Sequence, residues 1–481
     1  GGANSDSGAY QIDNSLRFND DDSPSMTIAS LGSSSSNAKK WTVSFWAKLS
    51  SGLGGHRCVF SAGESSGGNY VQLNFTDGDE LQLYSSNALG EADNTATNIK
   101  TNAKYRDVSA WYHVVWAIDT TQSTNTNRIK LYVNGAQVTS FATANNYPAQ
   151  NTDNDRVGAN NIDHFIGKFV DSSSQYVDGY LSDLYFIDGD AKAASDFGET
   201  NDNGVWIPKK YSGSFGNNGF KLEFQQTGTS ANASGMGADT SGNGNHLTPS
   251  NLTSLDVTED TPTNNFCTLN SIDPIQGAAY SEGNCKVVTN SSNRNYVTGT
   301  FGLTSGKWYW EAKLTAVTND DADQAFFGIA DLDDRGVNST GQSLGDRANE
   351  VGWHQEEGKY QRNNSWSSAH TDSWGIGDIC AIALDCDNNR VTIAKNGQWA
   401  DGSGNADESS PTSFVTYTAS TMTPAMGEGG GGTEATWECN FGNPAFSISS
   451  GNADANGYGN FEYAVPSGYY ALCTKNLAEY G

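Results

Sequence analysis

Short apolar runs with a period of two dominate the hydrophobic pattern of this chain. The clearest run places five apolar side chains on one face of a strand: Trp41, Val43, Phe45, Ala47 and Leu49. Comparable runs occur at residues 70–75, 80–84, 111–118, 128–133 and 180–187, and then at residues 306–314, 325–330, 378–385, 390–394 and 436–441. Turn pairs such as Asn134-Gly135 separate them, and long helical periodicity is hard to find. The pattern predicts an all-β protein made of antiparallel sheets.

The runs fall into two groups, which predict two tandem antiparallel β-sandwiches. We expect the first domain at residues 10–190 and the second at residues 271–450. Residues 191–270 are rich in Gly and turn residues, so we expect an ordered connector with one or two short strands, partly packed on its neighbours. Residues 451–481 are expected to form a C-terminal tail.

The chain is strongly acidic, with 55 Asp and Glu against 27 Lys and Arg and a net charge of −28. Such a surface repels phosphate backbones, so we expect no nucleic-acid partner. No apolar stretch approaches the length that spans a bilayer, so membrane insertion is not expected. The seven cysteines form no CxxC pair and sit in apolar runs, which favours buried free thiols.

The first domain resembles a laminin-G-like jelly roll of the concanavalin A-like class. The resemblance rests on residues 42–46 (TVSFW), 111–116 (WYHVVW), 130–135 (KLYVNG) and 179–184 (GYLSDL). The second domain resembles a SPRY domain, which is also a concanavalin A-like sandwich. Its motifs are residues 306–311 (GKWYWE), 327–330 (FGIA), 377–385 (GDICAIALD), 395–397 (KNG) and 440–446 (NFGNPAF).

The whole arrangement is similar to large virion proteins of marine tailed phages. The segments that carry this resemblance are residues 206–211 (WIPKKY), 218–220 (NGF), 260–266 (DTPTNNF) and 465–477 (VPSGYYALCTKNL). It implies a fibre-like appendage on the virion surface, with other virion proteins and a host-surface glycan or receptor as partners. Oligomerisation of identical chains is expected from that role, although the sequence has no coiled-coil heptads.

The sequence contains no motif that predicts an enzyme. Concanavalin A-like glycoside hydrolases need two carboxylates across the scissile bond, and no strand carries Glu-x-Asp-x-x-Glu or a close variant. The nearest acidic cluster, residues 77–80 (DGDE), is expected to be a turn. A Ser-His-Asp site is not expected either, because no Gly-x-Ser-x-Gly elbow precedes a helix, and His113 is expected to be a sandwich residue of the strand at residues 111–118. We therefore expect no catalytic residues and no required cofactor.

Calcium is the ion that we expect most, because the resemblance to laminin-G-like modules implies one. The leading candidates are Asp239, Asn243 and Asn245, which offer oxygen ligands on one turn. Other candidates are Asp153 with Asp155, and Asp320 with Asp321 and Asp323. The alternative for each cluster is a solvated acidic turn.

Glycan binding requires exposed aromatic side chains beside planar polar groups. Residues 353–366 have this chemistry, and in SPRY domains the ligand contacts come mostly from loops at one edge of the sandwich. The candidates are His354, Tyr360, Arg362 and Trp366. Trp353 and Tyr360 could instead be core residues at strand spacing, which leaves Arg362 and Trp366 as the stronger pair.

Four functions remain open at this point. The leading hypothesis is a non-enzymatic virion appendage that adheres to host-surface glycans. The others are a secreted bacterial surface lectin or adhesin, a polysaccharide-degrading enzyme, and a purely architectural decoration protein.

Overall fold

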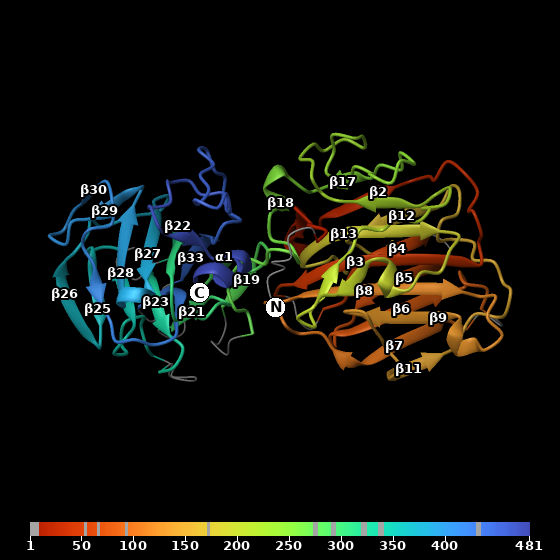
Figure 1. The fold of residues 1–481 in the computed structure, drawn as a ribbon, viewed down its shortest axis with the longest axis horizontal. Coiled ribbons are helices and arrows are strands. Elements are labelled where there is room, and N and C mark those ends of the chain that lie inside the picture. The colour runs from red at the N-terminus through yellow and green to blue at the C-terminus, as the bar shows by residue number, and fades with distance from the viewer. Residues whose placement is uncertain are drawn as a thin grey trace. The chain divides into compact units, whose positions relative to one another are not determined.

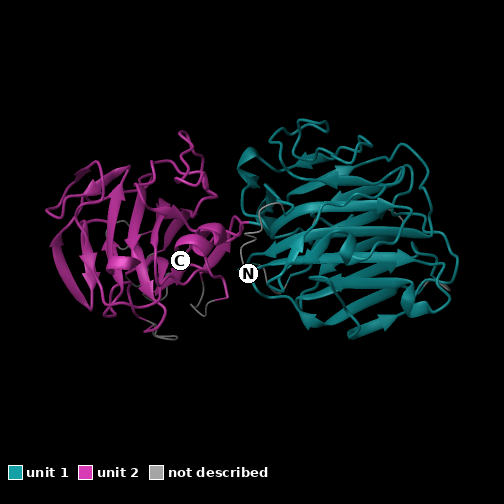
Figure 2. Ribbon diagram, viewed as in Figure 1, with its two compact units in different colours: residues 1, 6–263 teal, residues 2–5, 264–481 magenta. Residues whose placement is uncertain are grey.

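The chain forms two compact units whose regular secondary structure is almost entirely antiparallel strands, which confirms the predicted fold class (Figures 1 and 2). The computed structural model describes residues 9–51, 55–64, 68–91, 95–170, 174–272, 278–289, 295–318, 325–334, 341–429 and 434–481. Unit 1 spans Asp6–Thr263 and unit 2 spans Asn264–Gly481.

Unit 1 is a sandwich of two large antiparallel sheets. The first sheet has the order β10 (Ala136–Gln137), β9 (Ile129–Val133), β8 (Trp111–Asp119), β3 (Lys40–Leu49), β13 (Gly179–Asp188), β1 (Ser15–Phe18) and β18 (Val257–Thr258), with β16 (Phe220–Leu222) paired to β13. The second sheet has the order β11 (Phe141–Asn145), β7 (Thr97–Lys104), β6 (Glu80–Ser86), β5 (Asn69–Phe75), β4 (Arg57–Glu64), β12 (Asp163–Ile166), β2 (Ser25–Ile28) and β17 (Thr248–Ser250). A separate hairpin joins β14 (Gly198–Thr200) to β15 (Trp206–Pro208).

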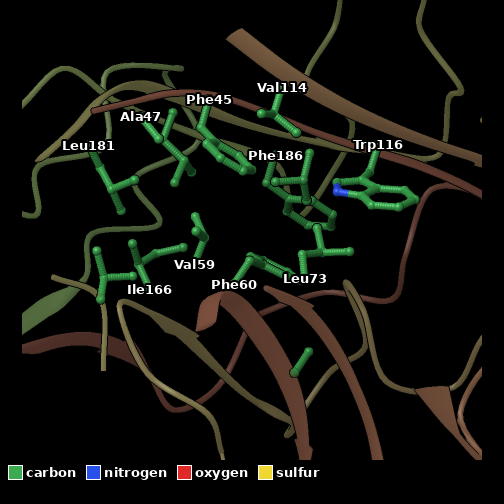
Figure 3. Close-up of a cluster of buried hydrophobic side chains, with 14 of the residues drawn as sticks. Phe45, Ala47, Val59, Phe60, Leu73, Val114, Trp116, Ile166, Leu181 and Phe186 are labelled. Atoms are coloured by element: carbon green, nitrogen blue, oxygen red, sulfur yellow. The ribbon is translucent and has the colours of Figure 1, made fainter. Parts of the chain in front are cut away.

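The core of unit 1 lies between these two sheets, as Figure 3 shows. The first sheet contributes Phe45, Val114, Trp116, Leu181 and Phe186, and the second contributes Val59, Phe60, Leu73 and Ile166. All five apolar residues predicted to share one face of β3 belong to this core. Because side chains alternate along a strand, every second residue of β3 packs against the opposite sheet. Burial of this apolar face stabilises the packing of the two sheets.

The predicted connector is not a separate segment, because residues 191–263 complete unit 1. In this stretch β16 pairs with β13, β17 pairs with β2, and β18 pairs with β1. Phe220 and Leu222 are fully buried in the core. The boundary therefore lies at residue 263 rather than 190 or 270. The expected short strand at residues 220–224 corresponds to β16, whereas β17 and β18 are too short to show an alternating pattern.

Unit 2 is also a sandwich of two sheets. Its first sheet has the order β19 (Ala279–Ser281), β20 (Lys286–Val288), β33 (Ala435–Asn440), β22 (Lys307–Val317), β27 (Ile379–Asp385), β28 (Arg390–Lys395), β29 (Gln398–Ala400) and β30 (Ala406–Glu408); β31 (Val415–Thr416) pairs with β28, and β34 (Tyr470–Ala471) pairs in parallel with β22. Its second sheet has the order β21 (Asn295–Thr298), β32 (Met422–Glu428), β23 (Ala325–Asp331), β24 (Val351–His354), β25 (Lys359–Arg362) and β26 (Ser365–Ala369). Trp308, Trp310, Trp353 and Trp437 fill the core between them.

The expected C-terminal tail, residues 451–481, is an integral part of unit 2. It supplies β34 and the one α-helix of the described chain, α1 (Thr474–Tyr480). Phe461 and Tyr469 from this stretch pack with Tyr309 of β22 and Trp399 of β29 in a second apolar cluster. The stretch therefore covers the outer face of the first sheet of unit 2.

A buried carboxylate fastens this covering stretch to β22. The Glu311 side chain is fully buried and accepts hydrogen bonds from the backbone N–H groups of Glu462 (2.9 Å) and Tyr463 (2.8 Å). It also accepts bonds from Tyr309 Oη (2.8 Å) and Asn440 Nδ2 (3.2 Å). Burial nevertheless raises the pKa of Glu311 to about 7, because the loss of solvation outweighs these donors.

All seven cysteines are buried and carry free thiols, as predicted from their apolar surroundings.

No helix among the described residues is both long and apolar enough to cross a bilayer.

Replacing Phe220 tests whether residues 191–263 belong to the core. We expect Phe220→Ala to lower the free energy of unfolding of unit 1 by about 3–5 kcal/mol, because it leaves a cavity between the sheets. Urea unfolding followed by fluorescence measures the change. The exposed residue Gln226 in the same segment provides the control variant Gln226→Ala. Equal stability of the two variants would contradict the assignment.

The raised pKa of Glu311 predicts a pH dependence of stability. The folded state holds the proton more tightly than the unfolded chain, so the stabilisation is complete below the unfolded value of 4.5 and is lost as the pH rises towards 7. The expected loss is on the order of 3 kcal/mol. Chemical unfolding at several pH values measures it. Glu311→Gln cannot titrate, so its curve should lack this slope; parallel curves for wild type and variant would refute the assignment.

Candidate functional site

The four predicted glycan-binding residues lie on strands β24, β25 and β26 at one edge of the second sheet of unit 2. Strand alternation divides them between the two faces of this sheet. His354 pairs with Phe326, and Trp366 pairs with Gln361. Tyr360 pairs with the core residue Trp353 and therefore points to the opposite face.

Trp366 and His354 meet on the outer face of the sheet. The Trp366 indole lies 5.3 Å from the His354 ring, edge to face, and 5.9 Å from the Phe326 ring. His354 and Phe326 are almost fully buried, whereas Trp366 is 50% exposed. The two buried rings therefore hold the indole in place and leave part of its surface open to solvent.

Tyr360 and Arg362 do not join this outer-face cluster. The Tyr360 ring packs 6.1 Å from Trp353 and 5.5 Å from His370, at the margin of the core. Arg362 donates from Nε to the carbonyl oxygen of Ala348 at 3.1 Å. Of the four candidates, only Trp366 presents a large aromatic surface to solvent.

Phe326 is the contributor to this surface that the sequence reasoning missed. It lies in β23, about forty residues before Trp366, and it reaches the site through the register Phe326↔His354. The alternating run at residues 325–330 contained the signal, because Phe327 belongs to the core and Phe326 must then face outwards. Only the pairing of β23 with β24 shows which outward residue lies beside it.

The proposed calcium ligands form a self-contained turn. Asp239 accepts four hydrogen bonds, from the N–H groups of Lys221, Ser241 and Asn245 and from Ser241 Oγ, at 2.8–2.9 Å. Asn243 and Asn245 direct their Nδ2 groups to the carbonyl oxygens of Gly216 and Gly219. Both carboxylate oxygens are already occupied, so these residues do not fit a resident calcium ion.

The other acidic clusters give no better ligand set. Asp153 forms an ion pair with Lys39 at 2.6 Å, and Asp155 forms one with Arg156 at 3.1 Å. Asp320, Asp321 and Asp323 lie outside the described residues. Within the described part of the chain, no group of three or more histidine, cysteine or acidic side chains is arranged to hold a metal ion.

A buried serine and histidine lie within hydrogen-bonding distance in unit 1, but the pair is not a nucleophile and its base. His113 Nε2 lies 2.9 Å from Ser44 Oγ, and both side chains are buried. Trp206 Nε1 donates to His113 Nδ1 at 3.0 Å, which leaves the proton of the neutral ring on Nε2. Burial lowers the pKa of His113 to about 3. The ring therefore donates to Ser44 and cannot accept its proton, which supports a structural role for His113.

Residues 20–195 match the family model of the concanavalin A-like lectin/glucanases superfamily. The match covers less than half of the chain. A search of curated proteins gives no match. The sandwich fold of these residues is one of carbohydrate-binding and adhesion-type domains, and the same fold also includes some glycosidases.

Among solved structures, the chain is similar to the SPRY domain of human HERC1, with 14% identity, a TM-score of 0.28, and coverage of 34% of this chain and 92% of that one. It is also similar to the native heptameric SAP-like pentraxin from Limulus polyphemus, with 16% identity, a TM-score of 0.27, and coverage of 38% and 80%. A human SPRY domain gives 12% identity, a TM-score of 0.23, and coverage of 32% and 90%. Similarities at this level establish nothing about ligands.

Replacing Asp239 tests the role of the turn. We expect Asp239→Ala to lower the stability of unit 1 by about 1–3 kcal/mol, because several N–H and O–H donors lose their acceptor. Thermal unfolding with added calcium and with a chelator measures it, and the loss should be the same in both. A loss seen only when calcium is present would show that the ion binds there.

Proposed function

We propose that this chain is a non-catalytic adhesion protein that binds glycans, and that Trp366 is a main contact in unit 2. The half-exposed indole, fixed against His354 and Phe326, is the observation that carries the proposal. A sugar ring offers an apolar C–H face that stacks on such a surface, and a side chain already fixed by packing loses little conformational entropy on binding. The sandwich class of residues 20–195 supports the same ligand class.

Several observations support a binding role over a catalytic one. No strand candidate in the sequence carries the Glu-x-Asp-x-x-Glu motif, or a close variant, that suits glycoside hydrolysis in this fold. The buried pair of Ser44 and His113 has the wrong tautomer for general-base catalysis. The buried carboxylates Glu311 and Glu350 are each engaged by neighbouring donors.

We further propose that the protein lies on the surface of a marine phage particle, as part of a fibre-like appendage that contacts the host. The succession of two sandwiches and the motifs in residues 206–211, 260–266 and 465–477 support this assignment by resemblance. Other virion proteins and further copies of this chain would be its partners, and many copies would raise a weak contact to useful avidity. Electron microscopy of particles labelled with an antibody to this chain tests it; a protein found only free of particles would contradict it.

Replacing Trp366 tests the glycan contact. We expect Trp366→Ala to weaken binding to glycan arrays and host cells by about tenfold or more, because the stacking surface is lost. The matched control is Ile376→Ala, since Ile376 is a similarly exposed apolar residue of unit 2 at 58%. Equal binding by the two variants would exclude Trp366 from the site.

A further inference from the structure

A lysine and an aspartate from neighbouring strands meet on the covered outer face of the first sheet of unit 1. Lys221 on β16 lies opposite Tyr185 on β13, and Asp183 precedes Tyr185 by two residues on the same face. Lys221 Nζ lies 3.3 Å from Asp183 Oδ1, and the two residues are only 7% and 1% exposed. The pair therefore connects β13 with β16 in a place that holds little water.

A second carboxylate contacts the same amine. Glu223 lies two residues after Lys221 and points to the same side, and its Oε1 lies 2.6 Å from Lys221 Nζ. Glu223 is only partly buried, whereas Asp183 is fully buried. The amine thus has one carboxylate in the buried position and another nearer to solvent, which is placed to accept and return a proton.

Two tyrosine hydroxyl groups hold the Asp183 carboxylate. Tyr185 Oη donates to Oδ2 at 2.7 Å, and Tyr10 Oη donates to Oδ1 at 3.1 Å. Both rings also lie over Lys221 Nζ, each with its centroid at 5.2 Å. The two donors draw charge from the carboxylate oxygens, which makes its carbon atom a better target for an amine.

The backbone of β13 is distorted at Asp183. The register of β13 with β3 shifts between Ser182 and Tyr185, and Asp183 itself has a φ of 44°, in the left-handed region. A bulge re-aims the side chains around it, and a residue in this region is held there by its surroundings at a cost in free energy. The distortion places the Asp183 carboxylate against the amine of Lys221.

Protonation decides whether this amine and this carboxylate react. Burial raises the pKa of Asp183, and the neighbouring Lys221 offsets only part of that rise. Burial alone would lower the pKa of Lys221, but Asp183, Tyr10 and Glu223 around it raise that pKa instead. The amine therefore keeps its proton at rest and must pass it to Glu223 before it can attack.

We propose that Lys221 and Asp183 form an intramolecular amide bond. The ammonium of Lys221 gives a proton to Glu223, the free amine attacks Cγ of Asp183, and the Nζ–Cγ bond forms. A Cγ–Oδ bond then breaks, and its oxygen leaves as water with the two protons that the nitrogen loses, one of them returned by Glu223. One ammonium and one carboxylate thus become one amide and one water molecule, with no oxidant or co-reactant.

Contact and the exclusion of water favour this bond. Amines and carboxylates do not condense readily in dilute water, but groups fixed in contact reach effective concentrations of about 10⁵ M or more. The rings of Phe197, Tyr211 and Phe215 pack around Tyr185 and keep out the water that would hydrolyse the product. A covalent link between β13 and β16 also restricts the unfolded chain and so stabilises unit 1.

The intact mass of the full recombinant chain tests the proposal. We expect the wild type to be lighter than its sequence by the mass of one water molecule. Trypsin does not cleave after an acylated lysine, so digestion should release a branched peptide that joins residues 169–192 to residues 211–286. Lys221→Arg lacks the amine and Glu223→Gln lacks the proton acceptor, so both variants should keep the full sequence mass.

Lys48→Arg is the matched control, because Lys48 on β3 forms a comparably buried ion pair with Asp260 at 2.8 Å. This variant should lose one water molecule, as the wild type does. A folded wild type that keeps its full sequence mass after prolonged incubation would overturn the proposal, and so would a loss of water that persists in Lys221→Arg. The branched peptide of the wild type decides the question even if a variant fails to fold, and no outcome bears on glycan binding by Trp366.

Discussion

Every sheet in this protein has two faces, and the sandwich core covers only one of them. The outer face must therefore be polar, be covered by another part of the chain, or be used for binding. In unit 1 the first sheet is covered, because Phe197 and Tyr211 pack on Val115 and Tyr185. In unit 2 the C-terminal stretch covers the first sheet. Part of the second sheet of unit 1 is covered as well, because Phe169 and Val170 pack on Cys58 of β4. The proposed contact Trp366 lies on the outer face of the second sheet of unit 2.

The need to cover outer sheet faces explains why the segments after each predicted sandwich are part of the fold. Residues 191–263 provide strands for both sheets of unit 1 and aromatic cover for one of them. Residues 451–481 provide β34 for the first sheet of unit 2 and cover that sheet, and Glu311 of β22 binds their backbone. A concanavalin A-like sandwich without its covering stretch would expose a continuous apolar patch on one face, which monomeric proteins avoid.

The sequence predicted the parts of this structure that depend on local alternation. The long strands β3, β8, β13, β22 and β27 were recognisable because each buries a row of side chains over seven or more residues. The short strands β17 and β18 depend on partners far away in the sequence and carry no local signal, whereas β16 falls in the alternating run at residues 220–224 and was expected as a short strand. The candidate site divides in the same way. Trp366 was predicted from its polar surroundings, whereas its supporting ring Phe326 and the separation of Tyr360 required the strand register.

Buried polar groups fix the covering segments to the sheets. His113 accepts a hydrogen bond from Trp206, and Glu311 accepts four. Other buried polar atoms of the described chain make no hydrogen bond, among them Thr392 Oγ1 on β28 and Trp310 Nε1 in the core of unit 2. A buried carboxylate that lost its four donors would cost far more than an unpaired indole or hydroxyl. The pairing of Glu311 is therefore the contact that makes the first sheet of unit 2 depend on its covering segment.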